Sequence, residues 1–376
     1  MEPIRILQVI GSLNNGGSQA MIMSIYENID RSKIQFDFVI DRPNELAYGK
    51  RIEELGGKIY FMPQFTAKNI FAFQKAWHNF YSNHPEYKIV HGHVRSTASI
   101  YLRIANKYGL TTVAHSHSTS SGSGLSAMIK NILQYPIRYT ADKFFACSIS
   151  AGEWLFGKRK CNNENFFILN NAIDAKKFIF KEEVRINKRK ELQIEDKFVI
   201  GHIGRFDTPK NHEFLIDIFK EVHDKNVNSV LILVGDGELR PTIEKKVNDL
   251  NLTDYVIFTG IRSDIPEILQ GMDVFVFPSL FEGLGIVAIE AQAAGLPCIV
   301  SDSIPKEAFI TSLIQSLPLN SSLDEWKEHI LYYSNTYRRR NMKDEISSAG
   351  YDINGTTQWL QDFYLGNCGE YEHRNR

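Results

Sequence analysis

The stretch VFVFPSLFEGLGIVAIEAQAAGLPCIVSD, residues 274–302, contains a complete strand–loop–helix–strand unit. Its two ends, 274–279 and 297–302, are continuously apolar and rich in β-branched residues, as strands buried on both faces are. Between them, a glycine-containing loop leads into a segment of helical period, which Gly295 is expected to close at its carboxyl end. We therefore expect parallel strands that are covered on both faces by helices.

Short apolar runs recur along the whole chain, and each is followed by a turn signal and a longer stretch of helical period. The expected strands of the first half are RILQVI (5–10), FDFVI (36–40), KIYFMP (58–63), IVHGH (89–93), TTVAH (111–115), KFFACS (143–148) and FFILN (166–170). Those of the second half are FVIGHIG (198–204), SVLILVG (229–235), YVIFTG (255–260), VFVFPS (274–279) and PCIVSD (297–302). Because the runs are continuous rather than alternating, we predict an α/β fold with two doubly wound parallel-sheet domains in series.

The charged segment KEEVRINKRKELQIEDK, residues 181–197, separates the two sets of strands. A solvated helix alone would explain its composition, and a linker beside such a helix fits the strand count. We therefore expect an N-terminal domain over residues 1–180 and a C-terminal domain over residues 181–351. The tail from about residue 325 is helical by period, and its last part, 352–376, is assigned to the N-terminal domain.

Length, charge and cysteine content limit the class of protein. With 376 residues the chain exceeds what one hydrophobic core usually serves, which agrees with two domains. The formal net charge of -1 gives no overall field that would attract nucleic acid, although a local basic patch is left open. The N-terminal apolar run is too short for a signal sequence, so we expect a cytoplasmic protein. Cys147, Cys161, Cys298 and Cys368 show neither metal-ligand spacing nor a disulfide framework.

Ligands of open parallel sheets bind at the carboxyl ends of the strands, so the loops after the apolar runs are the candidate sites. The first is GSLNNGGSQAM, residues 11–21. Gly16 and Gly17 precede Ser18, a good N-cap, and a helix that starts there would direct free N–H groups towards an anion. The glycines do not form the dinucleotide fingerprint G-x-G-x-x-G, and a structural turn explains them equally well.

The second loop is GRFDTPKNHEF, residues 204–214. Asp207 or Thr208 is expected to cap a helix here, which places Lys210 at a helix N-terminus and Arg205 at the end of the strand. Two cations beside free N–H groups are unfavourable with respect to the helix dipole unless an anion occupies the site. A diphosphate is the natural occupant, and solvated charges are the alternative.

The third loop is LVGDGELRPTIE, residues 233–244. Gly235 and Gly237 permit the close approach of a ligand after a buried strand, and a structural turn explains them equally well.

The fourth loop belongs to the stretch quoted at the start. Glu282 lies in the loop at the carboxyl end of the strand, and Glu290 projects from the helix among small, apolar neighbours. A carboxylate buried there without partners would be costly, and the hydroxyls of a sugar ring would supply hydrogen-bond donors. The alternative is a surface glutamate on an amphipathic helix.

Two histidine pairs end neighbouring strands, His91 with His93 and His115 with His117. A pair at i and i+2 on a strand faces one way, so either pair could ligate zinc. No Cys, Asp or Glu stands at ligand spacing nearby, and we predict no metal site. The Ser/Gly-rich stretch SHSTSSGSGLS, residues 116–126, reads as a flexible loop that could close over a substrate.

Taken together, these residues resemble the retaining, nucleotide-sugar-dependent glycosyltransferases of the GT-B fold, family four, also called glycosyl transferases group 1. Within this family, the chain is similar to the glycosyltransferases of capsule and exopolysaccharide biosynthesis. It is carried by FEGLGIVAIEAQAAGLPCIVSD with its Glu-x7-Glu spacing, and by GRFDTPKN, LVGDGELR, VIFTG and ILNNAID. It spans most of both halves and is strongest from residue 198 to 302.

The resemblance implies two Rossmann-like domains that face each other across a cleft, with the acceptor bound by the N-terminal domain and the donor by the C-terminal domain. Glu290 would take the ribose hydroxyls, and Glu282 would face the donor sugar with the backbone of residues 283–285. Arg205 and Lys210 would hold the diphosphate and stabilise the charge that develops on it. The assigned catalytic residues are Arg205, Lys210, Glu282 and His117, and the donor-binding residues are Gly16, Gly17, Gly204, Gly235, Gly283, Leu284, Gly285 and Glu290.

A nucleoside diphosphate leaves without an acid catalyst, which explains why no pair of opposed carboxyls, as in a glycosidase, is needed. Arg205, Lys210 and helix N-termini would replace a metal ion, so we expect a hexosyltransferase that needs neither a metal nor another cofactor. The family favours UDP as the nucleotide, with GDP and ADP left open. It also favours a glycan acceptor on a lipid-linked precursor of surface polysaccharide, made at the inner membrane face.

Two further predictions remain open from the sequence. Five cations, Lys130, Arg138, Lys158, Arg159 and Lys160, would contact anionic lipid or else are ordinary solvated charges. The main alternative to a transferase is a nucleotide-sugar-binding subunit without its own turnover, and another is a nucleotide-sugar 2-epimerase, for which the expected extra acid/base carboxylates are lacking.

Overall fold

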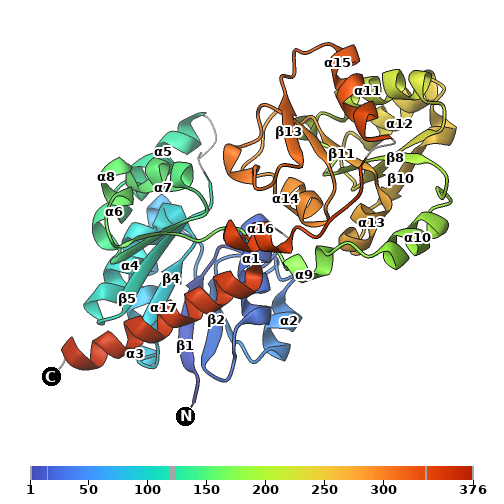
Figure 1. Cartoon of the computed structure of the whole chain (residues 1–376). Helices are drawn as coiled ribbons and strands as arrows, with labels where there is room; N and C mark the ends of the chain where they lie inside the picture. Colours follow the sequence, from blue (N-terminus) through green and yellow to red (C-terminus); the bar gives the residue numbers. More distant parts are fainter. Residues whose placement is uncertain (1, 15, 119–123, 335–336, 375–376) are drawn as a thin grey trace. The chain divides into compact units, whose positions relative to one another are not determined.

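The computed structural model describes residues 2–14, 16–118, 124–334 and 337–374. The chain forms two compact units (Figure 1). The first unit holds Met1–Ala172 together with Ile353–Arg376, and the second holds Ile173–Asp352. The second unit thus begins earlier than the expected boundary at residue 181, because Ile173, Ala175 and Phe178 are buried in its core.

The first unit is built on a parallel sheet with the strand order β3-β2-β1-β4-β5-β6-β7. Its described strands are β1 (Ile4–Val9), β2 (Ile34–Ile40), β3 (Ile59–Phe61), β4 (Ile89–Gly92), β5 (Thr111–Ser116), β6 (Lys143–Ala146) and β7 (Phe166–Ile168). Its described helices are α1 (Gly17–Asn28), α2 (Gly49–Glu54), α3 (Ile70–Asn83), α4 (Arg95–Lys107), α5 (Gly124–Gln134), α6 (Ile137–Thr140), α7 (Ile149–Phe156), α8 (Lys158–Cys161) and α17 (Ile353–Arg374).

Consecutive residues of one strand in this sheet belong to two different cores. Ile6 of β1 packs in the core that α1 and α17 cover, and Leu7 packs in the core on the other face, which α3, α4 and α7 cover. Both side chains are fully buried. The sheet is therefore covered on both faces, as its continuously apolar strands require.

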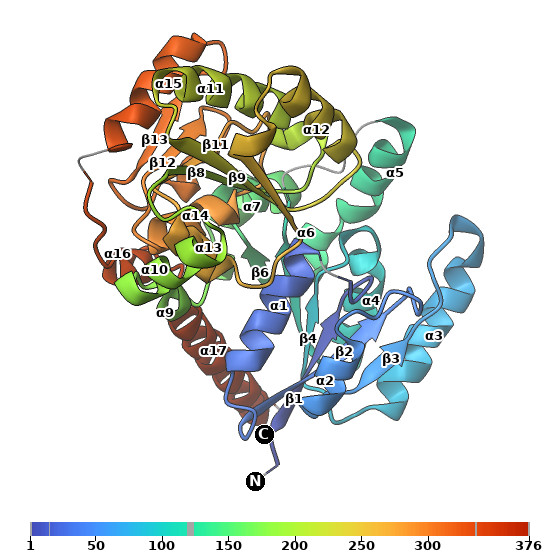
Figure 2. The same ribbon diagram turned by 90° about the vertical axis from the view of Figure 1, so that its right-hand side faces the viewer.

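Helix α17 follows the second unit in sequence and packs on the first. It lies beside α1, as both views show (Figures 1 and 2). Ile353, Leu360 and Tyr364 each expose 2% or less of their surface in the core that contains Ile6 and Phe36. The Tyr364 ring also meets the Phe36 ring edge to face at 5.9 Å. The end of the chain is thus part of the first unit.

The second unit has a parallel sheet with the strand order β10-β9-β8-β11-β12-β13. Its described strands are β8 (Phe198–Ile203), β9 (Ser229–Val234), β10 (Val256–Gly260), β11 (Val274–Phe277), β12 (Cys298–Ser301) and β13 (Ile314–Leu317). Its described helices are α9 (Ala175–Phe178), α10 (Glu182–Glu191), α11 (His212–Lys225), α12 (Arg240–Asp249), α13 (Ile265–Gly271), α14 (Ile286–Ala293), α15 (Leu323–Leu331) and α16 (Lys343–Ser348).

The two-sheet α/β fold and the twelve predicted strands are confirmed. β13 was not predicted, since its sequence IQSL is short and Gln315 in it is exposed at the edge of the sheet. The charged segment 181–197 forms α10, which packs against α13 within the second unit. Most of its residues are exposed, as a solvated helix requires, but Lys188 and Arg189 are only 8% and 7% exposed, so one side of the helix is buried in the second unit.

Loss of packing in α17 should destabilise the first unit. Leu360→Ala removes a side chain that is 2% exposed and should lower the free energy of unfolding by about 2–5 kcal/mol, because a cavity remains. The matched control Asp362→Ala, on the exposed face of the same helix, should change it by less than about 0.5 kcal/mol. Chemical denaturation of the whole chain measures both, and equal effects would contradict the placement of α17.

Candidate functional site

Four histidines gather on one face of the first sheet, at the carboxyl ends of β4 and β5. The rings of His91 and His93 stack at 4.5 Å, and those of His115 and His117 stack at 4.0 Å. The prediction that each pair faces one way is confirmed. The predicted flexible loop begins here, and its residues 119–123 lie outside the described part of the chain.

A buried glutamine connects these histidines into one hydrogen-bonded array. Gln8 of β1 accepts a bond on Oε1 from His93 Nε2 at 2.9 Å and donates from Nε2 to the Tyr364 hydroxyl at 3.3 Å. Tyr364 contacts His91 Nδ1 at 2.6 Å, and His91 Nε2 contacts His115 Nδ1 at 3.1 Å. A strand of the sheet and the C-terminal helix thus both hold the array.

The glutamine also fixes the tautomers of two rings. Since Gln8 Oε1 only accepts, His93 carries its proton on Nε2, and His93 Nδ1 is left to accept from His117 Nε2 at 2.8 Å. His117 Nδ1 is therefore unprotonated in the neutral ring, and it has no hydrogen-bond partner among the described residues. Such a bare nitrogen is suited to accept a bond from a hydroxyl.

The histidine array is held in its neutral form. Burial lowers the pKa of His91 and of His117 to about 3, and it lowers those of His93 and His115 well below the usual value. The charges of neighbouring rings, where protonated, act in the same direction. The array is thus a set of neutral donors and acceptors at working pH.

Three of these rings offer nitrogens close enough for a metal ion. Ligand atoms of His91, His93 and His115 lie within 4.8 Å of one another. Both nitrogens of His91 and of His93 already take part in hydrogen bonds, so a cation would have to break those bonds. The hydrogen-bonded array explains the cluster without a metal.

The glycine loop of the first unit starts helix α1 earlier than expected. The helix begins at Gly17 with Gly16 as its N-cap, and Ser18 is not the cap but lies in the first turn, where its hydroxyl donates to Gln19. A Cβ on Gly16 would meet Gln19 Oε1 at 2.4 Å, so a larger residue would displace the Gln19 side chain, whereas the space beside Gly17 is open. The free helix start at Gly17 is the part of this loop available to a ligand.

In the second unit, two predicted loops are bonded to one another at the carboxyl ends of β8 and β11. Leu280 N donates to the Pro209 carbonyl at 2.8 Å, and Asn211 Nδ2 donates to the Pro278 carbonyl at 3.1 Å. Asn211 has a left-handed backbone with φ +57°, so a 3₁₀ turn, Thr208–Lys210, ends there before α11 begins at His212. Asp207 is the N-cap of this short turn and Pro209 lies within it, which agrees with the prediction, although the Asp207 side chain makes no capping bond. The turn is separate from the long helix α11, so Lys210 precedes that helix.

The same contact brings Lys210 and Glu282 together. Lys210 Nζ lies 2.5 Å from Glu282 Oε1, and these side chains expose 20% and 11% of their surface. Lys210 also lies 4.9 Å above the ring of Phe277, and its stem passes Gly204, where a Cβ would be 3.2 Å away. Arg205 is exposed and has no ion pair among the described residues. The two loops thus present one paired and one unpaired cation.

Next to this pair, the loop after β11 offers unpaired backbone donors. The N–H groups of Gly283, Leu284 and Gly285 donate no hydrogen bond within the described residues. Gly285 has φ +78° and forms the N-cap of α14, while the space beside Gly283 is open. A ligand oxygen would find several donors and the positive end of a helix dipole here.

Glu290 lies one turn further along α14, on the side of Ile286. These two side chains are partly exposed, and the other residues from Val287 to Ala293 are buried. The Glu290 carboxyl has no hydrogen-bond partner among the described residues, and burial raises its pKa to about 7. It is therefore close to half-protonated at neutral pH and lacks donors that would stabilise its charge.

Gly235 is explained by packing alone. Its φ is +133°, and a Cβ there would lie 2.1 Å from the Gly204 carbonyl oxygen. Gly237 is equally confined, 2.5 Å from the Phe206 carbonyl oxygen. The glycines of the third loop thus let it pack on the second loop, and their presence requires no ligand.

The sequence analysis missed Gln8 and Tyr364, which organise the histidines. Gln8 was visible as the one uncharged polar residue inside the apolar run RILQVI. A buried amide in a central strand needs partners, and that requirement was the available signal. Tyr364 gave no signal, because its contact with His91 spans 273 positions of the sequence.

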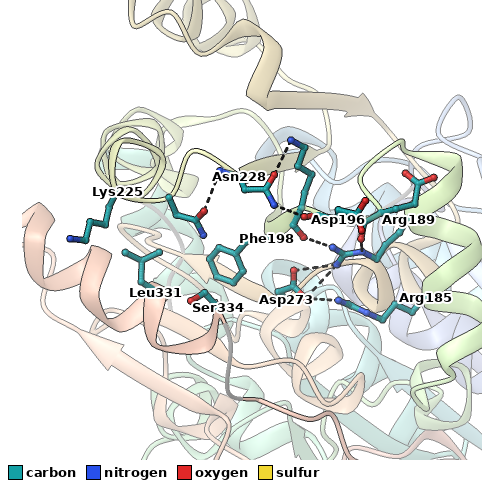
Figure 3. A pocket seen from close by; sticks show the side chains of 12 residues that line it. Arg185, Arg189, Asp196, Phe198, Lys225, Asn228, Asp273, Leu331 and Ser334 are labelled. Carbon is teal, nitrogen blue, oxygen red and sulfur yellow. Dashed lines mark hydrogen bonds and ion pairs between the residues drawn. The ribbon is translucent and has the colours of Figure 1, made fainter.

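A polar pocket of about 630 Å³ opens at the amino ends of the strands of the second sheet (Figure 3). Phe198 begins β8 and Asp273 directly precedes β11, so the pocket lies at the amino ends of the strands. Asp273 forms ion pairs with Arg185 at 2.5 Å and with Arg189 at 3.2 Å. These two ion pairs hold α10 to the sheet. The pocket therefore lies opposite the carboxyl ends of the strands, where ligands of parallel sheets bind.

Comparison with known proteins agrees with this geometry. The model of the family Glycosyl transferases group 1 matches residues 184–343, and that of Glycosyltransferase Family 4 matches residues 15–177. The putative glycosyltransferase EpsF of Bacillus subtilis (strain 168) is 32% identical over 368 residues, which is 96% of each chain. An Escherichia coli UDP-Gal:alpha-D-GlcNAc-diphosphoundecaprenol alpha-1,3-galactosyltransferase is 37% identical over 139 residues, 36% of each chain.

Solved structures share the fold. Anabaena Alr3699/HepE in complex with UDP and glucose has a TM-score of 0.74 at 18% identity, over 96% of this chain and 99% of that one. A glycosyltransferase from Rickettsia africae ESF-5 has a TM-score of 0.77 at 14% identity, over 98% and 99%. The two Rossmann-like units therefore form the GT-B fold.

The neutral histidine array predicts a specific dependence of stability on pH. Because the folded pKa values lie below the unfolded value of about 6.5, the stabilisation is complete above that pH and is lost as pH falls towards 3. Chemical denaturation should show a loss of about 2 kcal/mol for each of His91 and His117 between pH 7 and pH 5.

Gln8→Glu tests the origin of this loss. A carboxylate next to His93 Nε2 favours the imidazolium, so the loss between pH 7 and pH 5 should become smaller in this variant. His78→Gln, which lies outside the array, should keep the wild-type loss. The same loss in wild type and Gln8→Glu would show that the array does not cause it.

Proposed function

Since the chain belongs to the glycosyl transferases group 1 and is a hexosyltransferase with the GT-B fold, we propose that it transfers a hexosyl unit from a UDP-sugar with retention of configuration. The proposed acceptor is a glycan on a lipid-linked precursor of surface polysaccharide. The protein would reach it by peripheral contact with the inner membrane face. The observation that carries the donor site is the pairing of Lys210 with Glu282 beside the unpaired N–H groups of residues 283–285.

Lys210 and Arg205 have the role of binding the diphosphate. Lys210 is mostly buried and needs an anion near it, which Glu282 supplies before the donor arrives. A diphosphate would take over this role, and Glu282 would then be released to accept hydrogen bonds from hydroxyls of the donor sugar. As the glycosidic bond breaks, negative charge grows on the diphosphate, and both cations stabilise it without a metal ion.

The neighbouring groups complete the donor site. The N–H groups of Gly283, Leu284 and Gly285 would donate to oxygens of the donor at the start of α14. Glu290 would accept bonds from the ribose hydroxyls, which supply the donors that its carboxyl lacks in the described residues. Gly204 leaves room for the Lys210 stem, and Gly235 supports the loop that carries Gly204.

The first unit would contribute two further groups. The bare Nδ1 of His117 is proposed to accept a bond from a hydroxyl of the donor sugar or the acceptor. The helix start at Gly16 and Gly17 is proposed to donate to the diphosphate. UDP as the nucleotide and a lipid diphosphate as the acceptor's carrier are supported by the Escherichia coli relative, which is a UDP-Gal:alpha-D-GlcNAc-diphosphoundecaprenol alpha-1,3-galactosyltransferase.

Nucleotide binding should depend on the ionisation of Glu290. Its pKa of about 7 means that the carboxylate is the minor form at pH 6 and the major form at pH 8. Since hydroxyls donate best to the carboxylate, UDP affinity measured by calorimetry should rise by up to about tenfold from pH 6 to pH 8.

Glu290→Gln should remove this pH dependence and weaken UDP binding at pH 8 by about 1.5–3 kcal/mol. Titration of GDP and ADP into the same protein defines the base preference. If no nucleotide binds to the wild type, the carboxylates are structural and the donor site proposed here is wrong.

Transfer should depend on Lys210. Lys210→Ala should reduce the rate of sugar transfer to a membrane-derived lipid acceptor by about 10²–10³, because a cation that stabilises the leaving diphosphate is lost. The control Lys220→Ala removes a lysine of α11 that pairs with Asp224 and should leave the rate unchanged. The wild-type rate should persist in excess EDTA.

The alternative of a non-catalytic subunit makes the opposite prediction. It requires UDP-sugar binding without transfer across a panel of acceptors. Unchanged transfer in both Lys210→Ala and Glu290→Gln would equally rule out the proposed site, whereas formation of an epimer from the UDP-sugar alone would indicate 2-epimerisation.

A further inference from the structure

Helices α5 and α6 of the first unit expose large apolar side chains that its cores do not use. Met128, Ile129 and Ile132 on α5 expose 55%, 49% and 66% of their surface. Tyr135 and Tyr139, at and after its end, expose 53% and 70%, and their rings are 6.1 Å apart. An exposed group of this kind on a folded unit marks an interaction surface.

The apolar side chains share one side of the segment. Ile132 follows Met128 by four positions and Ile129 by three, which places them on one face of α5. The opposite face holds Ala127 and Gln134, which are each 6% exposed, and Ile137 of α6 is fully buried. Met128, Ile129 and Ile132 of α5 are thus in contact with solvent, opposite the face that packs on the unit.

Cations surround these side chains. The Arg138 guanidinium lies 4.2 Å from the ring centre of Tyr135, and the charges of Arg138 and Arg159 act on the Tyr139 hydroxyl. Lys130 on α5 is exposed. Helices α5, α6, α7 and α8 lie together in the first unit, coloured green to teal in Figure 1.

The charge of this segment differs from that of the whole chain, whose formal net charge is -1. Residues 124–161 contain only two acidic side chains, Asp142 and Glu153. Asp142 is bonded to Thr112 at the start of β5. The basic side chains of the segment are Lys130, Arg138, Lys143, Lys158, Arg159 and Lys160.

We propose that α5, α6 and α8 form a docking surface for an anionic lipid bilayer, in which Met128, Ile132 and Tyr139 enter the headgroup region. The cations would lie on the lipid phosphates, and the tyrosine rings suit the boundary between apolar and polar layers. No helix in the described residues is long and apolar enough to cross a bilayer.

A lipid surface fits better than a protein partner because two independent features coincide. The apolar group is flanked by cations and lacks the acidic side chains that an ordinary mixed protein interface would carry. An interfacial segment needs this combination, since it gains both apolar burial and attraction to anionic headgroups. The proposal rests on the proposed function in one respect only, that a lipid-linked acceptor explains why docking is useful.

Co-sedimentation of the whole protein with vesicles tests the surface. The protein should bind vesicles of phosphatidylcholine mixed with phosphatidylglycerol, should bind pure phosphatidylcholine much more weakly, and should be released by salt. Ile132→Ser should weaken binding about tenfold, and Lys158→Glu with Arg159→Glu should weaken it at least about tenfold and reduce the salt dependence.

Matched controls separate this surface from exposure in general. Phe71→Ser on α3 removes an apolar side chain that is 83% exposed in the same unit and should leave vesicle binding unchanged. Binding of UDP should be the same in all these variants. If the wild type does not bind UDP, that result contradicts the proposed function and leaves the docking surface untouched.

Three results would overturn the proposal. The first is that the wild type does not bind the anionic vesicles, and the second is that Ile132→Ser and the Lys158/Arg159 double variant both bind them as the wild type does. The third is a dimer in analytical ultracentrifugation that Ile132→Ser dissociates, because a second copy of the chain would then cover the surface.

Discussion

The burial of parallel strands on both faces is the constraint on which the other features depend. Neighbouring residues such as Ile6 and Leu7 serve two different cores, so a strand has no face left for an unpaired polar group. Polar chemistry is thereby moved to the loops at the carboxyl ends of the strands. Gln8 lies inside a strand, and both ends of its amide are bonded within the histidine array.

The fold could be predicted wherever this constraint leaves a local pattern. Twelve strands were visible as continuous apolar runs, but β13 was not, since Gln315 at the sheet edge interrupts its pattern. The division between the units was placed too late along the chain, because composition changes at residue 181 whereas packing changes at Ile173. Packing across long sequence separations, as between Tyr364 and His91, leaves no local pattern at all.

The candidate site divides in the same way. The loops were predicted, because glycines and charges directly after buried strands are a local signal. The pairing of Lys210 with Glu282 was not, because it needs the 3₁₀ turn that ends at Asn211 and the bonds between two loops 72 positions apart. The tautomer of His117 was equally out of reach, since Gln8 sets it through His93.

These arrangements have a common electrostatic consequence. Each group that would meet a charged or hydroxylated ligand is kept close to neutral without it: Lys210 by Glu282, Glu290 by a pKa near 7, and His117 by burial. The cost of burying isolated charges is thus avoided. Arg205, which is exposed, needs no such compensation. A donor with a diphosphate and several hydroxyls would supply the missing partners together, so its binding would separate Lys210 from Glu282 and ionise Glu290 in one step.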